Sequence, residues 1–236
     1  MRNYFVFDYN DSRDFGVYIS GQGTFNAPGR EYENIAVPGR DGDLLAPNTR
    51  LSNIQLTYPA FIYANFAENM ASLKSMLLSR IGYKRLEDTY HPDEFRLAFY
   101  RGDLNPTVRS RNDAAEFDLT FECDPRRFLK VGENKWEITS SGTMYNPTGF
   151  AAKPLIRVYG SGTLGVGSDT ITIASNSYPY IDIDSEVSDC YYGVNNANSL
   201  VTFSANDFPV FSEDSTNISA SGSITKVEIT PRWWRV

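Results

Sequence analysis

Three carboxylates at alternating positions, Asp182, Asp184 and Glu186, have a spacing that could serve acid–base catalysis or calcium binding. On a strand, residues i and i+2 share a face roughly 7 Å apart. Paired glycosidase carboxylates use similar separations. However, the intervening Ile181 and Ile183 explain the same pattern as a strand with one buried and one solvated face. The pattern therefore favours a structural strand over a catalytic pair.

Four glycines, Gly160, Gly162, Gly165 and Gly167, follow a predicted strand and resemble a phosphate-binding loop. A phosphate loop leads into a helix N-terminus, and a P-loop also carries Lys followed by Ser or Thr. Here residues 169–173 read Asp-Thr-Ile-Thr-Ile, which is a strand pattern. We therefore predict a hairpin turn and no nucleotide cofactor.

The remaining reactive residue types do not form a catalytic pattern. His91 is the only histidine and lies in a polar loop sequence, and no Gly-x-Ser-x-Gly motif is present. Cys123 and Cys190 are far apart in a chain of 236 residues, so we predict two small buried hydrophobes and no disulfide framework. Since metal-ligand clusters are also lacking in the sequence, we predict a protein without catalytic residues, cofactor or metal.

Tryptophan is the one residue type that points to a sugar ligand. Trp233 and Trp234 near the end of the chain, and Trp136, could each stack on a sugar ring. A terminal strand that packs one of its tryptophans inward would explain the same residues. Both alternatives stay open at this point.

Charge and hydropathy exclude two classes of partner. The net charge is −7, with about −2 in residues 1–130 and about −5 in the remainder. Lys and Arg are not clustered as a nucleic-acid binder requires. No run of eighteen apolar residues could span a membrane, and residues 1–8 are too short for a signal peptide. We expect a soluble protein made in the cytoplasm.

The clearest strand pattern lies in the middle of the chain. From Phe117 to Cys123 apolar residues alternate with polar ones, as in a strand with one face in a core. Proline cannot donate to a ladder, so we predict that Asp124-Pro125 ends this strand. We place a domain boundary shortly afterwards, giving domains 1–133 and 134–236.

The other elements are mostly short strands. One helix is predicted over 65–81, with Asn65 and Glu68 resembling a capping box and Gly82 at the C-cap. Its apolar face comprises Phe66, Met70, Leu73, Leu77 and Ile81. Strands are predicted at 4–7, 17–19, 31–37, 51–60, 96–100, 108–111, 136–139, 155–159, 171–173, 180–183, 200–203 and 227–229. The second half, with no helix, has the strand spacing of a two-sheet sandwich.

A long hairpin is predicted where two turn motifs interrupt the first half. Its residues are Val37, Pro38, Gly39, Arg40, Asp41, Gly42, Asp43 and Leu44. Pro-Gly and Asp-Gly supply the backbone angles that tight turns require. The polar flanks suggest an arm whose unpaired edges could recruit a partner strand. An ordinary surface loop explains the local sequence equally well.

The order of these features resembles the distal tail protein (Dit) family of long-tailed phages that infect Gram-positive bacteria. The resemblance covers nearly the whole chain and is carried by its motifs in order. They are the Pro38-Gly39-Arg40-Asp41-Gly42 hairpin, the single helix, Phe121-Glu122-Cys123-Asp124-Pro125, Lys153-Pro154-Leu155-Ile156, Gly160-Ser161-Gly162, Ile183-Asp184-Ser185-Glu186 and Pro231-Arg232-Trp233-Trp234. The hairpin and the Cys-Asp-Pro motif in this order are the most specific.

The resemblance implies a fold, an assembly and a place of action. The fold is mainly β: an N-terminal β-sandwich-like domain with one α-helix and a protruding hairpin, then a C-terminal galectin-like β-sandwich. The assembly is a homohexameric ring at the tail tip of the virion, in which the hairpin reaches a neighbour. Its partners are the tail tube protein, the end of the tape-measure protein, the tail-associated (Tal) protein and receptor-binding or baseplate proteins.

One departure from the galectin pattern bears on the second domain. Galectins hold sugar with a histidine and a tryptophan, and residues 134–236 contain no histidine. Docking of a partner protein at Asp182, Asp184 and the tryptophans is therefore expected ahead of sugar binding. A module that binds host cell-wall polysaccharide remains the alternative function, and a glycosidase that uses Asp182 and Asp184 is the third.

Overall fold

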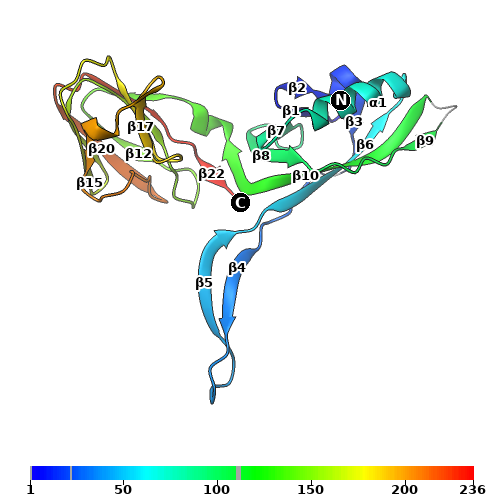
Figure 1. Ribbon diagram of the computed structural model, residues 1–236, viewed down its shortest axis with the longest axis horizontal. Helices are drawn as coiled ribbons and strands as arrows, with labels where there is room; N and C mark the ends of the chain where they lie inside the picture. The colour runs from blue at the N-terminus through cyan, green and yellow to red at the C-terminus, as the bar shows by residue number, and fades with distance from the viewer. Residues whose placement is uncertain (1, 22, 110–112) are drawn as a thin grey trace. The chain divides into compact units, whose positions relative to one another are not determined.

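The computed structural model describes residues 2–21, 23–109 and 113–236, with the backbone alone at 47–49. The described residues form a mainly β structure with one α-helix, as predicted (Figure 1). The chain divides into two compact units. The first comprises Met1–Arg127 with Val236, and the second comprises Phe128–Arg235.

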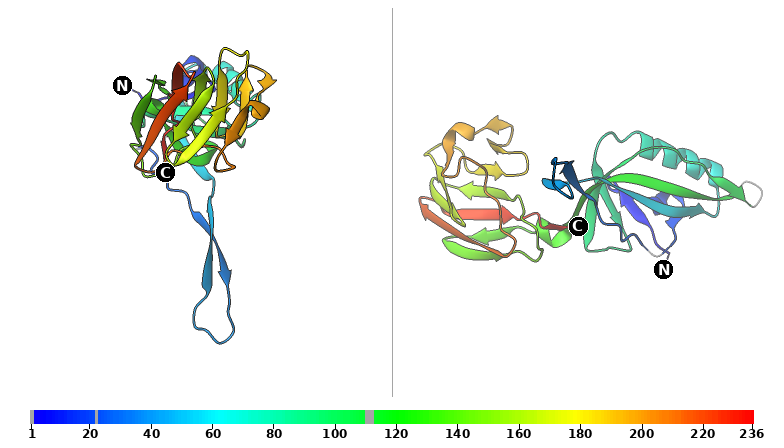
Figure 2. Two further views of the ribbon diagram at one scale, coloured as in Figure 1. Left: turned by 90° about the vertical axis from the view of Figure 1, so that its left-hand side faces the viewer. Right: turned by 90° about the horizontal axis from the view of Figure 1, so that it is seen from below.

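The first unit is built on a nine-stranded sheet that one helix covers on one face (Figure 2). The strand order is β2-β1-β7-β8-β10-β6-β3, and β9 and β22 also pair with β10. The ninth strand, β22 (Trp234–Arg235), belongs to the second unit. The strands are β1 (Phe5–Phe7), β2 (Asn10–Asp11), β3 (Val17–Ile19), β6 (Ile54–Ile62), β7 (Lys84–Asp88), β8 (Glu94–Tyr100), β9 (Thr107–Arg109) and β10 (Ala114–Leu129). A bridge between Asn3 and Ile19 links the N-terminal segment to β3.

The long antiparallel pair of β6 and β10 forms the middle of the core. Its register runs from Ala115 opposite Ile62 to Cys123 opposite Ile54. Alternation buries Leu119, Phe121 and Cys123 completely, as the sequence pattern predicted. The Phe121 ring lies between 5.1 and 6.2 Å from four other rings, those of Phe5, Phe7, Tyr58 and Tyr100. Phe121 is therefore the centre of an aromatic cluster.

The prediction that Asp124-Pro125 ends this strand is wrong, because β10 continues to Leu129. The Asp124 carboxylate accepts hydrogen bonds from the backbone N–H and the side chain of Arg126, at 2.9 and 3.0 Å. Proline is tolerated in a strand where its nitrogen has no ladder bond to make. The last strand, β22 (Trp234–Arg235), pairs with β10, and the Leu129 N–H donates to the Trp233 carbonyl at 2.8 Å.

The helix is shorter than the sequence predicts. It is α1 (Phe66–Leu78), which buries Met70, Leu73, Met76 and Leu77 against the sheet. Asn65 adopts a left-handed conformation with φ of 52° and makes no side-chain cap, so the predicted capping box is not formed. Ser79 is the C-cap, and Ile81 is 89% exposed beyond it. The apolar spacing therefore predicted the buried face of the helix but not the residues at which it begins and ends.

The second unit is a sandwich of two antiparallel sheets around one core (Figure 2). One sheet has the order β11-β21-β13-β16-β17-β18 and the other β12-β20-β14-β15-β19. The strands are β11 (Trp136–Ile138), β12 (Ser141–Tyr145), β13 (Leu155–Tyr159), β14 (Gly162–Val166), β15 (Asp169–Ile173), β16 (Ile181–Asp184), β17 (Asp189–Tyr192), β18 (Asn195–Asn196), β19 (Val201–Phe203), β20 (Ser215–Gly222) and β21 (Lys226–Thr230).

The glycine-rich segment that resembled a phosphate loop is a β-hairpin whose first strand packs closely against the backbone of β20. Strands β14 and β15 form the predicted hairpin, with Gly167 in its turn at φ of +62°. Gly162 has φ of +145°, and a Cβ added there would overlap the carbonyl oxygen of Ser221 on β20. Glycine is thus required because two backbones cross too closely for any side chain.

Candidate functional site

The predicted hairpin forms a sheet of its own, separate from the nine-stranded sheet. Strands β4 (Arg30–Ile35) and β5 (Leu44–Leu51) pair antiparallel, with Ile35 opposite Leu44 (Figure 1). Gly39 and Gly42 have φ of +80° and +78°, and nothing described lies within 4 Å of a Cβ built on either. We call residues 30–51 the arm and residues 38–43 its tip.

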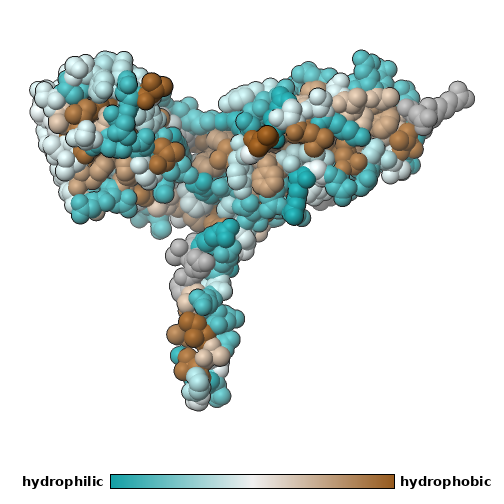
Figure 3. Space-filling model, viewed as in Figure 1, coloured by the Kyte–Doolittle hydropathy of each residue, from teal (hydrophilic) through white to brown (hydrophobic). Residues whose placement is uncertain are grey.

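The arm exposes large apolar side chains that are not buried against any described residue of the unit. Every residue from 32 to 45 is exposed. The exposed fractions are Tyr32 55%, Ile35 41%, Val37 39%, Leu44 45% and Leu45 59%, and apolar surface is visible along the arm in Figure 3. Register places Ile35 and Leu44 on one face, with Tyr32 and Leu45 on the other. A two-stranded hairpin alone is marginally stable in water, and exposed apolar surface of this kind is typical of protein–protein interaction sites.

The two carboxylates considered for catalysis are held in ion pairs. Arg157 binds Asp182 through two hydrogen bonds of 2.7 and 2.9 Å, and Arg232 binds Asp184 likewise at 2.6 and 2.9 Å. The Asp182 and Asp184 side chains are only 5% and 7% exposed. Burial raises the pKa of Asp184, but its bonds to Arg232 outweigh burial and lower it. Neither carboxylate is free to transfer a proton or to bind a partner in this arrangement.

The bonded carboxylate of Glu228 gives the second unit an acid-sensitive stability. Bonds from Lys226 and Tyr159 lower the pKa of Glu228 from 4.5 to about 2. A carboxylate with a lowered pKa in the folded state stabilises it above its unfolded pKa, and this contribution is lost as the pH falls through the folded pKa. We therefore expect the free energy of unfolding to decline between about pH 4.5 and about pH 2. Urea titrations followed by tryptophan fluorescence at each pH would measure it.

A matched variant isolates the contribution of Glu228. Glu228→Gln keeps the size of the side chain and removes its ionisation, so its unfolding free energy should be lower at pH 7 and flatter between pH 4.5 and 2 than in the wild-type chain. An identical pH profile for the two proteins would show that this carboxylate is not responsible.

The three tryptophans occupy different environments in the second unit. Trp233 is 2% exposed and packs against Phe211 in the core, so its ring offers no face to a sugar. The Trp234 ring lies 4.6 Å from Phe150, and its Nε1–H donates to the carbonyl of Ala151 at 2.9 Å. Trp136 on the edge strand β11 is 51% exposed. Trp136 is therefore the ring best placed for stacking.

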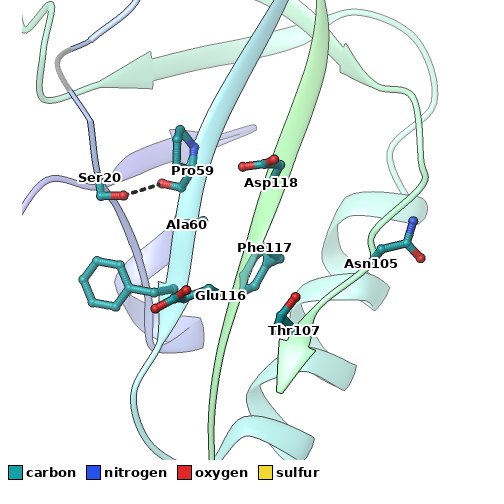
Figure 4. Close-up of a pocket in the computed structure, with 9 residues that line it drawn as sticks. Ser20, Pro59, Ala60, Asn105, Thr107, Glu116, Phe117 and Asp118 are labelled. Atoms are coloured by element: carbon teal, nitrogen blue, oxygen red, sulfur yellow. Dashed lines mark hydrogen bonds between the residues drawn. The ribbon is translucent and has the colours of Figure 1, made fainter. Parts of the chain in front are cut away.

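A second surface, which the sequence did not predict, lies on the outer face of the nine-stranded sheet. Alternation turns Phe61, Glu116 and Asp118 away from the core, and a pocket of about 540 Å³ opens beside them (Figure 4). Ser20, Pro59, Asn105 and Thr107 also line it. Its lining combines apolar side chains with two carboxylates and with amide and hydroxyl groups. The residues that line the pocket come from four separate segments of the chain, so no local sequence motif predicts them.

The cysteines and the histidine are buried or hydrogen-bonded within the fold. Burial raises the pKa of the Cys123 and Cys190 thiols to about 12. His91 Nε2 lies 3.1 Å from the Thr24 carbonyl oxygen. Within residues 2–21, 23–109 and 113–236, no three metal-ligating side chains gather at one point. In the same ranges, no helix has both the length and the apolar character of a membrane span.

Comparison with known proteins identifies the fold. No family model and no curated protein matches the chain. Among solved structures, the crystal structure of SPP1 Dit, described as a paradigm of the hub adsorption apparatus in phages that infect Gram-positive bacteria, superimposes with a TM-score of 0.75 at 13% identity. The match covers 100% of both chains.

Two structures of the phage P2 baseplate in its activated conformation are also similar. The calcium form gives a TM-score of 0.51 at 11% identity over 97% of each chain. The strontium form gives 0.54 at 12% identity over 100% of this chain and 98% of the other. The chain thus has a Dit-like fold along its whole length, and the predicted resemblance is confirmed at the level of fold.

Proposed function

We propose that this protein is the structural hub of a phage tail tip. In this proposal six copies form a ring that joins the tail tube to the adsorption proteins. The observation that carries it is the full-length similarity to SPP1 Dit, with a TM-score of 0.75. Fold alone does not imply function, and the exposed surfaces of this chain provide the second support.

The arm supports an assembly role independently of the comparison. A ring requires heterologous contacts, in which one patch of a subunit meets a different patch on the next. The exposed apolar residues on both faces of the arm, together with its unpaired strand edges, can make such a contact. Residues 1–133 then form the ring, and residues 134–236 dock other tail proteins.

The proposed partners follow from a place at the tail tip. They are the tail tube protein, the end of the tape-measure protein, the Tal protein and the receptor-binding or baseplate proteins. The protein would be made in the host cytoplasm and act in the virion, without catalysis. The sugar-binding alternative rests on Trp136, which is the one candidate ring that is largely exposed among the described residues. A saturable change in tryptophan fluorescence with host cell-wall polysaccharide would favour that alternative.

Removing the tip of the arm should weaken the ring and leave both units folded. Deleting residues 39–42 shortens an exposed turn, and nothing described lies within 4 Å of a Cβ built on Gly39 or Gly42. Circular dichroism and the unfolding curve should therefore match those of the wild-type chain. The mass measured by light scattering across a range of protein concentrations should correspond to six chains for the wild type and to fewer for the deletion.

A point variant and a matched control sharpen this test. Leu45→Ser removes an apolar side chain from the arm that is 59% exposed, whereas Val194→Ser removes one from the second unit that is 100% exposed. We expect only Leu45→Ser to reduce the six-chain species. Equal masses for the two variants and the wild type would contradict the role of the arm.

A further inference from the structure

Three aromatic rings and one arginine form a patch on the outer face of the nine-stranded sheet. Tyr18 on β3 and Phe61 on β6 are register partners with ring centres 5.9 Å apart. The Tyr63 ring lies 5.7 Å from Tyr18, and the guanidinium carbon of Arg2 lies 4.6 Å from the centre of the Tyr63 ring and 5.3 Å from that of Tyr18. We call these four residues the aromatic patch.

The guanidinium of Arg2 has no carboxylate partner among the described residues. Glu116, the register partner of Phe61, is paired with Arg109 at 3.0 Å. An arginine that stacks on aromatic rings keeps its N–H groups free for a carboxylate. Arg2 is therefore held in position for an anionic group from outside the unit.

A free negative charge lies on the other side of Phe61. Asp118 on β10 is the register partner of Pro59, and no described residue pairs with it. Between Asp118 and the aromatic patch lies the pocket of about 540 Å³, to which Phe61 and Pro59 contribute. The surface thus presents an unpaired positive charge and an unpaired negative charge, with a pocket of mixed apolar and polar lining between them.

The tip of the arm has the complementary composition. Arg40, Asp41 and Asp43 are exposed, and no described group pairs with any of them. Val37 and Leu44, at the base of the tip, are 39% and 45% exposed. The tip therefore offers two unpaired carboxylates, one unpaired guanidinium and apolar side chains within a few residues.

We infer that the tip of one copy docks on the aromatic patch and pocket of a second copy of this chain. Asp41 and Asp43 face Arg2, Arg40 faces Asp118, and the apolar side chains of the arm cover Phe61. The inference rests on the proposed ring-forming function and names the surface that receives the arm. Because tip and patch are different surfaces, the contact is heterologous and can repeat around a ring. Charge pairs at such a contact set its register and partner choice more than its affinity.

A charge swap tests this contact. Arg2→Glu places like charges together, as does the double variant Asp41→Lys with Asp43→Lys, and like charges facing one another are strongly unfavourable. Each should raise the protein concentration at half-assembly by roughly tenfold or more, measured by sedimentation velocity and light scattering. The variant with all three substitutions restores opposite charges and should recover assembly.

A matched control uses the helix on the opposite face of the sheet. Lys74 on α1 is exposed and outside the patch, so Lys74→Glu makes the same change in net charge as Arg2→Glu. It should assemble like the wild type. Circular dichroism verifies that every variant is folded.

The outcomes separate this docking from the ring itself. If Arg2→Glu assembles as fully as the wild type, the docking is wrong while the ring stands. A triple variant that assembles no better than either parent would likewise overturn the pairing of tip and patch. A wild-type chain that remains a monomer at every concentration would count against both the docking and the ring in the isolated protein.

Discussion

Gly162→Val should unfold the second unit at a lower urea concentration than in the wild-type chain. A valine Cβ would overlap the carbonyl oxygen of Ser221, and φ of +145° is a conformation that valine rarely adopts. Relief requires β14 and β20 to separate, which disrupts their ladder. We expect a loss of about 3–5 kcal/mol in the free energy of unfolding, at the upper end for single substitutions.

The tryptophans make this measurement specific. Trp136, Trp233 and Trp234 all belong to the second unit, so tryptophan fluorescence during urea unfolding reports that unit alone. Gly149→Ala is the control, because Gly149 is exposed, has no positive φ and has nothing within 4 Å of an added Cβ. If Gly162→Val unfolded at the same urea concentration as Gly149→Ala, the close crossing of the two strands would be refuted.

Phe121→Ala should have a comparable effect on the first unit. Phe121 is fully buried and its ring meets those of Phe5, Phe7, Tyr58 and Tyr100. Truncation leaves a cavity in the middle of this cluster. Replacing a buried phenylalanine by alanine typically lowers the free energy of unfolding by about 3–5 kcal/mol. Calorimetry should show a lower melting temperature for the first unit.

The control substitution removes the same ring from the surface. Phe25 is 80% exposed, and its described ring contact is to His91 at 5.6 Å. Phe25→Ala should change the unfolding free energy by no more than about 0.5 kcal/mol. Similar melting temperatures for the two variants would mean that the cluster around Phe121 is not the main source of stability.

Strands with strong alternation could be predicted from the sequence, whereas polar strands could not. The segment at 117–123 alternates apolar residues with polar ones, and the segment at 155–159 has large apolar residues on both sides of Arg157; both are strands. Strand β20 (Ser215–Gly222) has Ile218 as its only large apolar residue. Its ladder with β12 and β14 depends on sheet partners far away in the chain, so local sequence carries no signal for it.

The candidate sites also differ in whether local sequence could predict them. The arm was predictable because Pro-Gly and Asp-Gly act locally on the backbone. The aromatic patch was not, since Arg2, Tyr18 and Phe61 meet only through the bridge between Asn3 and Ile19 and the pairing of β3 with β6. The ion pairs of Asp182 and Asp184 were also missed, because their arginines lie 25 and 48 residues away in sequence.

The two cysteines give each unit its own chemical reporter. Cys123 lies in the first unit and Cys190 in the second, both are fully buried, and burial raises the pKa of each thiol to about 12. Since the thiolate is the reacting form, a maleimide or a disulfide reagent cannot modify either residue until its surroundings open. The rate of labelling at each cysteine therefore measures how often that unit opens in an otherwise native chain. The same protection means that a cysteine introduced at the tip of the arm could be labelled alone, without removing the native thiols.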